Sequence, residues 1–355
     1  MKGKSRARVL LTATVVAAAT VCAGTADSVA DSPAVGSGTG VYVGTVPLTT
    51  LKTAGTYLLK DPTRGNTATK DGSAGPIMSD LDNVWGNGLA TNRQSAAVDA
   101  QFTAASVWDY FKSTFNRIGV RNDGQGIRSV VHYSNNYSNV FWDDTCVCVS
   151  YGDGSGNGHP ITELDVGARE ITHGVTSATA GLSYTGEAGA LNEATSDIFG
   201  TMVEFYANIP ADVPDYFLGE KINWNGDGTP LRSMDRPSRD GASPDYYSKA
   251  IPGMDPSLAS GVADHFFFLL AEGSGPRTIN GIAYDSPTAN GSTLTGIGRG
   301  AAAAIWYRAL AIYLTSTDTY HGARLATLNA AADLYGTLSP EYAATAAAWT
   351  AVSVP

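Results

Sequence analysis

Basic residues are scarce in this sequence. The 355 residues include 23 lysines and arginines against 33 aspartates and glutamates, which gives a formal net charge of −10. A surface of this sign repels the phosphates of nucleic acids and of anionic lipids, so neither nucleic acid nor a membrane surface is expected as a partner. The composition instead fits a soluble exported protein, including one that binds calcium.

Cysteine is rarer still, with three in the chain. Two of them, Cys146 and Cys148, stand in the segment DTCVCVS with one residue between them. Such a pair forms either a tight disulfide or two free thiols, and an oxidising exterior favours the disulfide. A site for a soft metal would need further cysteines, which the segment does not supply.

The apolar run near the N-terminus, from Val9 to Gly24, is too short to span a membrane comfortably, which argues against a membrane anchor. It follows four basic residues between positions 2 and 8, and small residues follow it at positions 26, 28 and 30. This order is typical of a secretory signal. Residues 1–30 are therefore predicted to be a signal peptide, and the mature chain to be secreted and extracellular, with a charge of about −13.

The character of the chain changes once. Up to about residue 160, short alternating segments such as GVYVGTV (40–46) and SVVHYS (129–134) predict strands, and one helix is predicted over 97–119. From there on helices predominate, and they are predicted over 164–178, 189–208, 298–315 and 323–336.

The two halves are predicted to meet near residues 169–173. We place a β-rich domain at 31–181, which ends in the helix that carries the segment REITH, and an α-helical domain at 182–355. The fold class is therefore expected to be α+β, with two domains.

The segment GAREITHGV (167–175) matches a zinc-protease helix at all but one key position. In the pattern HExxH, two histidines four residues apart share one helix face and hold zinc, and the glutamate activates a metal-bound water. Glu170 and His173 are present here, but Arg169 stands where the first histidine belongs. A guanidinium stays protonated and carries only donors, so it cannot ligate zinc.

A further candidate ligand, Glu193, follows His173 by twenty residues in the segment GALNEATSD. Two antiparallel helices joined by a loop of this length bring such positions together, giving one imidazole and one carboxylate. Zinc would still need a third protein ligand. None of the other histidines lies four residues from His173, so they are predicted to be structural. They are His132, His159, His265 and His321.

The segment ITHGVTSATAGLSYTGEAGALNEATSDIFGTMVEFYAN resembles the core of the thermolysin family of secreted zinc endopeptidases. Further segments correspond in the same order, among them HYSNNYSNVFWDD, YGDGSGNG, LRSMDRP, DYYSK and GVADHFFFLLAEG. The resemblance covers roughly residues 40–352. It implies the two-domain thermolysin-like fold with an active-site cleft between the domains, and zinc and calcium as the family's cofactors.

The resemblance also implies roles for individual residues. Glu170 matches the general base, His173 and Glu193 match zinc ligands, and Tyr184 matches a hydrogen-bond donor to the transition state. The other matches are Asn139, the backbone of Val140 and Arg232 for substrate binding, Asn192 and Asp197 for orienting the zinc ligands, and Asp165, Glu204, Asp215 and Glu220 for calcium.

Phe217 stands where the family often has a further acidic residue, so a second adjacent calcium is not expected.

Three departures from the family pattern bear on activity. Arg169 replaces the first histidine ligand, and Ser257, in MDPSLASG, stands where the family has the histidine that stabilises the tetrahedral intermediate. The family's N-terminal propeptide is not found between the predicted signal and GTGVYVGTV. We expect Arg169 to occupy the metal position as a cation paired with Glu193 and Asp197, so that zinc does not bind tightly.

These observations predict a secreted thermolysin-like homologue that is a catalytically inactive pseudoprotease and keeps a peptide-binding cleft and a calcium site. Its expected partners are a peptide or protein substrate, or an inhibitor, bound by a monomer. The alternative is an active or weakly active zinc-dependent endopeptidase that cleaves before bulky hydrophobic residues. The loss of two catalytic histidines favours the first interpretation, because metal activation of water and oxyanion stabilisation are each worth orders of magnitude in rate.

Overall fold

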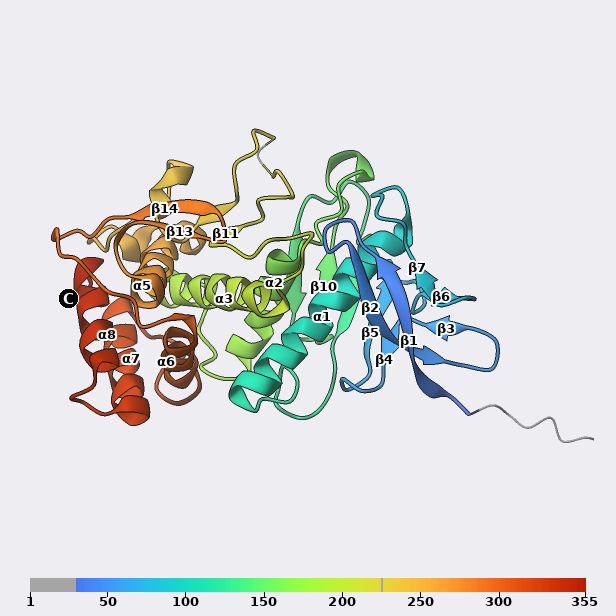
Figure 1. The fold of residues 1–355 in the computed structure, drawn as a ribbon, viewed down its shortest axis with the longest axis horizontal. Helices are drawn as coiled ribbons and strands as arrows, with labels where there is room; N and C mark the ends of the chain where they lie inside the picture. The colour runs from blue at the N-terminus through green and yellow to red at the C-terminus, as the bar shows by residue number, and fades with distance from the viewer. Residues whose placement is uncertain (1–29, 225) are drawn as a thin grey trace, which may run out of the picture.

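The computed structural model describes residues 30–224 and 226–355, so the predicted signal peptide lies, apart from Ala30, outside the described residues. Strands β1–β10 gather at one end of the molecule and helices α5–α8 at the other (Figure 1). Helices α2 (Leu164–Ser177) and α3 (Gly186–Ala207) lie between these two parts. The arrangement is the predicted α+β architecture. Within the described ranges, no helix combines the length and apolar composition that a membrane crossing requires.

Two mixed sheets make up the β-rich part. The first has the strand order β6-β3-β2-β1-β7, with β1 (Ser32–Thr39), β2 (Thr45–Lys52), β3 (Tyr57–Leu58), β6 (Ser79–Asp80) and β7 (Val84–Trp85). The second has the order β4-β5-β8-β10-β9, with β4 (Lys60–Asp61), β5 (Thr67–Asp71), β8 (Arg128–Val131), β9 (Val140–Asp143) and β10 (Cys148–Tyr151). Strand β9 is therefore an edge strand, paired with β10 on one side.

The strand predicted at 40–46 is wrong, because most of this segment is the turn between β1 and β2. The cause is Asp99, a buried residue whose carboxylate accepts hydrogen bonds from the backbone amides of Val41, Tyr42 and Val43 at 3.0–3.1 Å. Amides that point at one carboxylate cannot join a strand ladder. The segment 41–43 therefore forms a turn around the Asp99 carboxylate instead of a strand.

Helix α1 (Arg93–Phe115) begins and ends four residues earlier than the predicted range 97–119. Asn92 caps its start, because its side chain accepts a hydrogen bond from the Gln94 amide. The helix stops where Asn116 adopts the left-handed conformation, with φ 54°. Asparagines set both boundaries, and the spacing of apolar residues, on which the prediction rested, carries no information about them.

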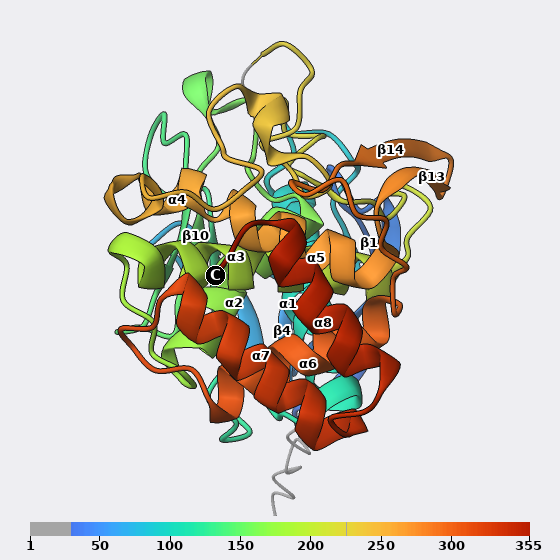
Figure 2. The same ribbon diagram turned by 90° about the vertical axis from the view of Figure 1, so that its left-hand side faces the viewer.

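The helical part closes the other end of the molecule. Figure 2 shows α6, α7 and α8 side by side on this face. Behind them, the ring of Phe266, on α5, stacks on that of Trp349, on α8, with centroids 3.7 Å apart. The elements here are α4 (Pro256–Ala259), α5 (Gly261–Glu272), α6 (Arg299–Ile312), α7 (Tyr320–Tyr335), α8 (Pro340–Ala351) and the hairpins β11 (Phe217–Leu218) with β12 (Arg232–Ser233) and β13 (Gly275–Ile279) with β14 (Ile282–Ser286).

Candidate active site

Helices α2 and α3 carry the central residues of the candidate site. Helix α2 is buried from Leu164 to Thr176, and beyond its end Gly181, at φ 61°, donates its amide to the Thr176 carbonyl at 2.8 Å. Helix α3 approaches α2 closely at Gly200, where an added Cβ would lie 2.8 Å from the Asp165 carbonyl oxygen. This close approach brings side chains of the two helices into direct contact.

The Arg169 side chain lies at the centre of the site, and only 8% of the residue is exposed. Its Nε donates to Asp197 Oδ1 at 2.6 Å. Its Nη1 donates to Glu170 Oε1, and its Nη2 donates to Glu193 Oε2. Burial lowers the pKa of Arg169, but Glu193, Asp197 and Glu170 together raise it well above its usual range. The guanidinium is thus a fixed cation, and Glu170 is a partner that the sequence did not predict.

His173 faces the same centre. Its Nδ1 donates to Asn192 Oδ1 at 2.8 Å, a contact that assigns a proton to Nδ1 and directs Nε2 toward the site. Nε2 lies 3.8 Å from Glu193 Oε1 and 3.5 Å from Arg169 Nη1. The structure therefore brings His173 and Glu193 together, and it places Asn192 where it orients the imidazole.

A second arginine, Arg232, stands on the other side of Asp197. Its Nη1 donates to Asp197 Oδ2 at 3.2 Å, to Ser260 Oγ at 2.8 Å and to the Ser257 carbonyl. Asp264, buried nearby, has a pKa that burial and then the Asp197 charge raise well above its usual range. Arg232 therefore directs Nη1 at protein groups, which leaves Nη2, 3.9 Å from an oxygen of Glu193, as the candidate substrate anchor.

Arg169, Glu170, His173, Glu193 and Arg232 line a cleft of about 520 Å³. Strand β9 and the residue before it form one wall, which includes Asn139, Val140 and Trp142. Tyr184, 57% exposed, lies with its ring centroid 5.8 Å from that of His173. The rest of the lining is Phe141, Val166, Trp224, Leu231 and Ser257.

Ser257 lies at the rim of this cleft, where the resemblance places a catalytic histidine. Its Oγ donates to Asp255 Oδ1 at 2.7 Å, and its amide donates to the same oxygen at 2.9 Å. The hydroxyl thus belongs to the N-terminal turn of α4. It has no proton-binding imidazole to offer to a charge that develops in the cleft.

The side chains around Arg169 do not fit a zinc ion. A catalytic zinc takes three protein ligands and a water. His173 Nε2 and Glu193 Oε1 both face the centre, but the other oxygen of Glu193 accepts from Arg169. A guanidinium about 4 Å from a divalent cation repels it by about 8 kcal/mol at an effective dielectric constant of ~20. The Arg169 guanidinium therefore disfavours zinc binding at this site.

Carboxylates also gather around the start of α2. Oxygens of Glu163, Asp165 and Glu220 lie within 4.8 Å of one another, and so do oxygens of Glu204, Asp212 and Glu220. Three of these were predicted from the sequence, whereas Glu163 and Asp212 were missed. Asp215, also predicted, is in neither group: its Oδ1 accepts from the Phe217 amide at 2.6 Å, and its own amide donates to Glu204 at 3.4 Å.

This acidic cluster fits a calcium ion. Glu204 Oε1, Glu220 Oε2 and both Asp212 carboxylate oxygens are buried and have no hydrogen-bond partner among the described residues. Lys221 Nζ lies 2.7 Å from Asp212 Oδ1, close enough for an ion pair but outside hydrogen-bond geometry. Burial, with the Asp212 charge, raises the pKa of Glu163 to about 7 and of Asp215 to about 6. Calcium takes oxygen ligands of this kind and would offset their repulsion.

Comparisons with known proteins identify the family of this chain. A family model described as "Thermolysin metallopeptidase, catalytic domain" matches residues 35–177, and one described as "Thermolysin metallopeptidase, alpha-helical domain" matches residues 180–354. The transglutaminase-activating metalloprotease of Streptomyces mobaraensis is 52% identical over 324 residues, which cover 90% of this chain and 42% of that protein. A bacillolysin of Bacillus cereus is 40% identical over 335 residues, which cover 90% of this chain and 55% of that protein.

A solved structure is similar as well. The precursor of protealysin, a metalloproteinase from Serratia proteamaculans, matches with a TM-score of 0.59 and 26% identity over 81% of this chain and 87% of that one. The chain spans about half the length of the curated relatives it matches. The two models of one family together cover both the β-rich and the helical part. The chain therefore belongs to the thermolysin family of metallopeptidases, and it has that family's two-domain α+β fold.

Proposed function

We propose that this chain is an exported pseudoprotease of the thermolysin family, which binds polypeptide segments in its cleft without hydrolysing them. The observation that carries the proposal is the buried Arg169 guanidinium. It forms an ion pair with Glu193, one of the two groups that would hold zinc, and it places a fixed positive charge where the metal would lie. A cleft that keeps its walls but lacks a metal can still bind a chain.

The surroundings of Glu170 support the same proposal. A general base needs a free carboxylate oxygen within hydrogen-bonding reach of the group that it deprotonates. Oε1 of Glu170 accepts from Arg169 Nη1, and Oε2 lies 4.0 Å from His173 Nε2. Arg169 therefore already takes up one of the two carboxylate oxygens that Glu170 would need as a general base.

The wall formed by β9 supports binding of an extended peptide. Strand β9 has one edge paired with β10 and the other edge at the cleft. An extended segment can add to such an edge through backbone hydrogen bonds, while side chains enter pockets beside it. Phe141, Trp142 and Trp224 supply aromatic surface to the cleft. We propose apolar segments of a protein substrate or inhibitor as its ligands, bound by a monomer.

The second candidate function is zinc-dependent hydrolysis before bulky hydrophobic residues. The observation in its favour is that Glu170, His173 and Tyr184 line one cleft. For this function Arg169 would have to leave Glu193, and a third ligand would have to come from elsewhere. The Streptomyces relative is a metalloprotease by name, but this chain covers 42% of it.

Asn139→Ala is expected to weaken peptide binding about fivefold to tenfold, because one hydrogen bond to the ligand backbone is lost. The measurement is a titration of the mature protein with an acetylated, amidated hexapeptide of leucine, phenylalanine and alanine, followed by tryptophan fluorescence. Asn290→Ala is the matched control, an exposed asparagine in the loop that contacts α8, and it should leave affinity unchanged. Mass spectrometry should find the peptide intact; cleavage would support the second candidate, and no binding would refute the cleft proposal.

Calcium is expected to raise the melting temperature by about 5 °C or more at saturating concentration, because the ion binds carboxylates that are buried together only in the folded chain. Glu204→Gln removes one buried charge. Without calcium this variant should be at least as stable as the wild type, and with calcium it should lose most of the gain. Asp82→Asn, at an exposed loop carboxylate, should keep the full gain. Equal responses to calcium in all three proteins would contradict the proposed site.

A further inference from the structure

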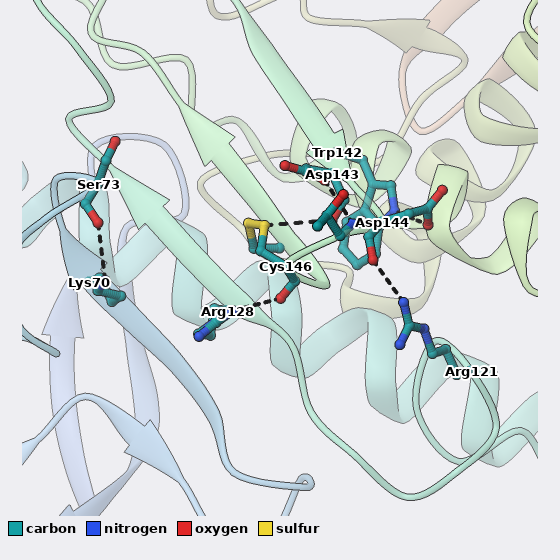
Figure 3. The surroundings of a disulfide bond; sticks show 10 residues. Lys70, Ser73, Arg121, Arg128, Trp142, Asp143, Asp144 and Cys146 are labelled. Atoms are coloured by element: carbon teal, nitrogen blue, oxygen red, sulfur yellow. Dashed lines mark hydrogen bonds between the residues drawn. A yellow bond between two sulfur atoms is a disulfide. The ribbon is translucent and has the colours of Figure 1, made fainter.

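The β9–β10 hairpin carries a disulfide whose two cysteines are separated by one residue. Cys146 and Cys148 are joined across 5.2 Å between their Cα atoms, at the end of the hairpin (Figure 3). Cys148 is 7% exposed, whereas Cys146 is partly exposed. The bond closes a loop of three residues. Because the entropy that a disulfide removes from the unfolded chain grows with loop length, a loop this short adds little stability.

The residue inside the loop has a strained backbone. Val147 adopts φ 52°, in the left-handed region that a β-branched side chain disfavours. The other non-glycine residues with positive φ among those described are asparagines, serines and one histidine, which tolerate it better. The side chain of Val147 packs against the core and is thus held in place. Opening the disulfide would free this backbone to relax.

We propose that the Cys146–Cys148 disulfide is a thiol–disulfide exchange site for low-molecular-weight thiols, and that its opening loosens the β9 edge of the cleft. An external thiolate attacks the more exposed Cys146 Sγ, a new sulfur–sulfur bond forms there, and Cys148 leaves as a thiolate that takes a proton from water. A second thiol attacks the mixed disulfide and releases Cys146. Two external thiols are oxidised to one disulfide, and the protein disulfide is reduced to two thiols.

Contacts around the turn connect the disulfide to the cleft. In the hairpin, Cys148 pairs with Asp143 and Val149 pairs with Trp142, which lines the cleft. Trp142 Nε1 donates to Asp144 Oδ1 at 2.8 Å, and Ser177, the last residue of α2, donates to Asp144 Oδ2 at 2.8 Å.

Two arginines hold the same turn (Figure 3). Arg121 donates to the Asp144 carbonyl and Arg128 donates to the Cys146 carbonyl, each at 2.8 Å. The turn is therefore held by the disulfide and by contacts to α2, to β8 and to the loop that carries Arg121. Removing the covalent link leaves the hydrogen bonds and the packing of Val147 and Trp142 against the core to fix the position of β9.

Val147→Gly tests the exchange site directly, because glycine adopts positive φ without penalty. Each mature protein is equilibrated with glutathione buffers of stepped composition, alkylated, and analysed by mass spectrometry. The wild-type disulfide should be reduced with an equilibrium constant about tenfold larger than that of Val147→Gly, with Val147→Asn between them. Equal constants for the three proteins, or a wild-type disulfide that stays intact in millimolar glutathione, would overturn the proposal.

The effect on the cleft rests on the proposed function and has its own measurement. Amide hydrogen exchange at 140–143 should be about tenfold faster in Cys146→Ser/Cys148→Ser than in the oxidised wild type, while exchange in α7 is unchanged. Peptide affinity should fall severalfold in the same variant. Unchanged exchange at 140–143 would overturn the coupling. If the wild type binds no peptide, the proposed function fails, but the glutathione and exchange measurements still decide this inference.

Discussion

Arg169→Met is expected to lower the free energy of unfolding by about 3–5 kcal/mol, because it leaves buried carboxylates without their cation. Arg169 contacts Glu170, Glu193 and Asp197, and each of these residues is largely buried. Methionine has a similar length and no charge, so the change removes the ion pairs while keeping most of the volume. Chemical denaturation monitored by circular dichroism measures the loss.

Arg93→Met is the matched control for this variant. Arg93 pairs with Asp71, but its side chain is 58% exposed, so its removal should cost less than about 1 kcal/mol. Similar losses for the two arginines, or no loss for Arg169→Met, would mean that Arg169 is not the cation on which the carboxylates depend.

Arg169→His is expected to raise the affinity for zinc by roughly three orders of magnitude or more, because it adds a third ligand and removes the repelling cation. The histidine would stand four residues before His173 on α2, and Glu193 would be free of its present partner. Arg169→Gln is the control, since it removes the charge without supplying an imidazole and should not bind zinc tightly. Elemental analysis and competition with a chromophoric chelator measure the affinities.

The same series separates zinc binding from hydrolysis. With Arg169→His alone, activity on casein should be low, because Ser257 supplies no imidazole and its hydroxyl already donates to Asp255 rather than to the developing oxyanion. Adding Ser257→His should raise kcat by about 10²–10³. Full activity in the single variant would show that Ser257 is not a catalytic defect, and zinc binding by Arg169→Gln would show that charge alone excludes the metal.

Much of the fold could be predicted from the sequence, because the apolar periodicity of α2 and α3 and the spacing between His173 and Glu193 are local and regular. The boundaries of α1 and the turn at 40–44 could not. They depend on side-chain hydrogen bonds from Asn92 and Asp99 to backbone amides, and for Asp99 these reach across almost sixty residues.

The candidate site was predictable where residues match a motif and less so elsewhere. The pairing of Arg169 with Glu193 and Asp197 followed from charge balance in the motif. Glu170 was missed as a partner, because adjacent helix residues do not normally face each other. Arg169 reaches it because the arginine side chain is long and flexible.

The acidic cluster shows the same limit. Glu163 precedes α2 and Asp212 lies in the loop after α3, so neither is part of a recognised segment. A signal for Asp212 existed in the density of acids in ADVPDYFLGEK, where three carboxylates occur within nine residues. The strain at Val147 had no such signal, since a valine between two cysteines does not reveal the sign of its φ.

If Arg169 takes the place of the catalytic zinc, the wild-type protein should neither hold zinc nor hydrolyse protein. The most direct measurement is the zinc content of the purified, mature wild-type protein after equilibration with a slight excess of zinc and gel filtration, with casein hydrolysis assayed on the same sample. We expect far less than one zinc per chain and no chelator-sensitive hydrolysis. One zinc per chain together with hydrolysis that a chelator abolishes would contradict this expectation, and would show that Arg169 moves aside and another residue completes the metal site.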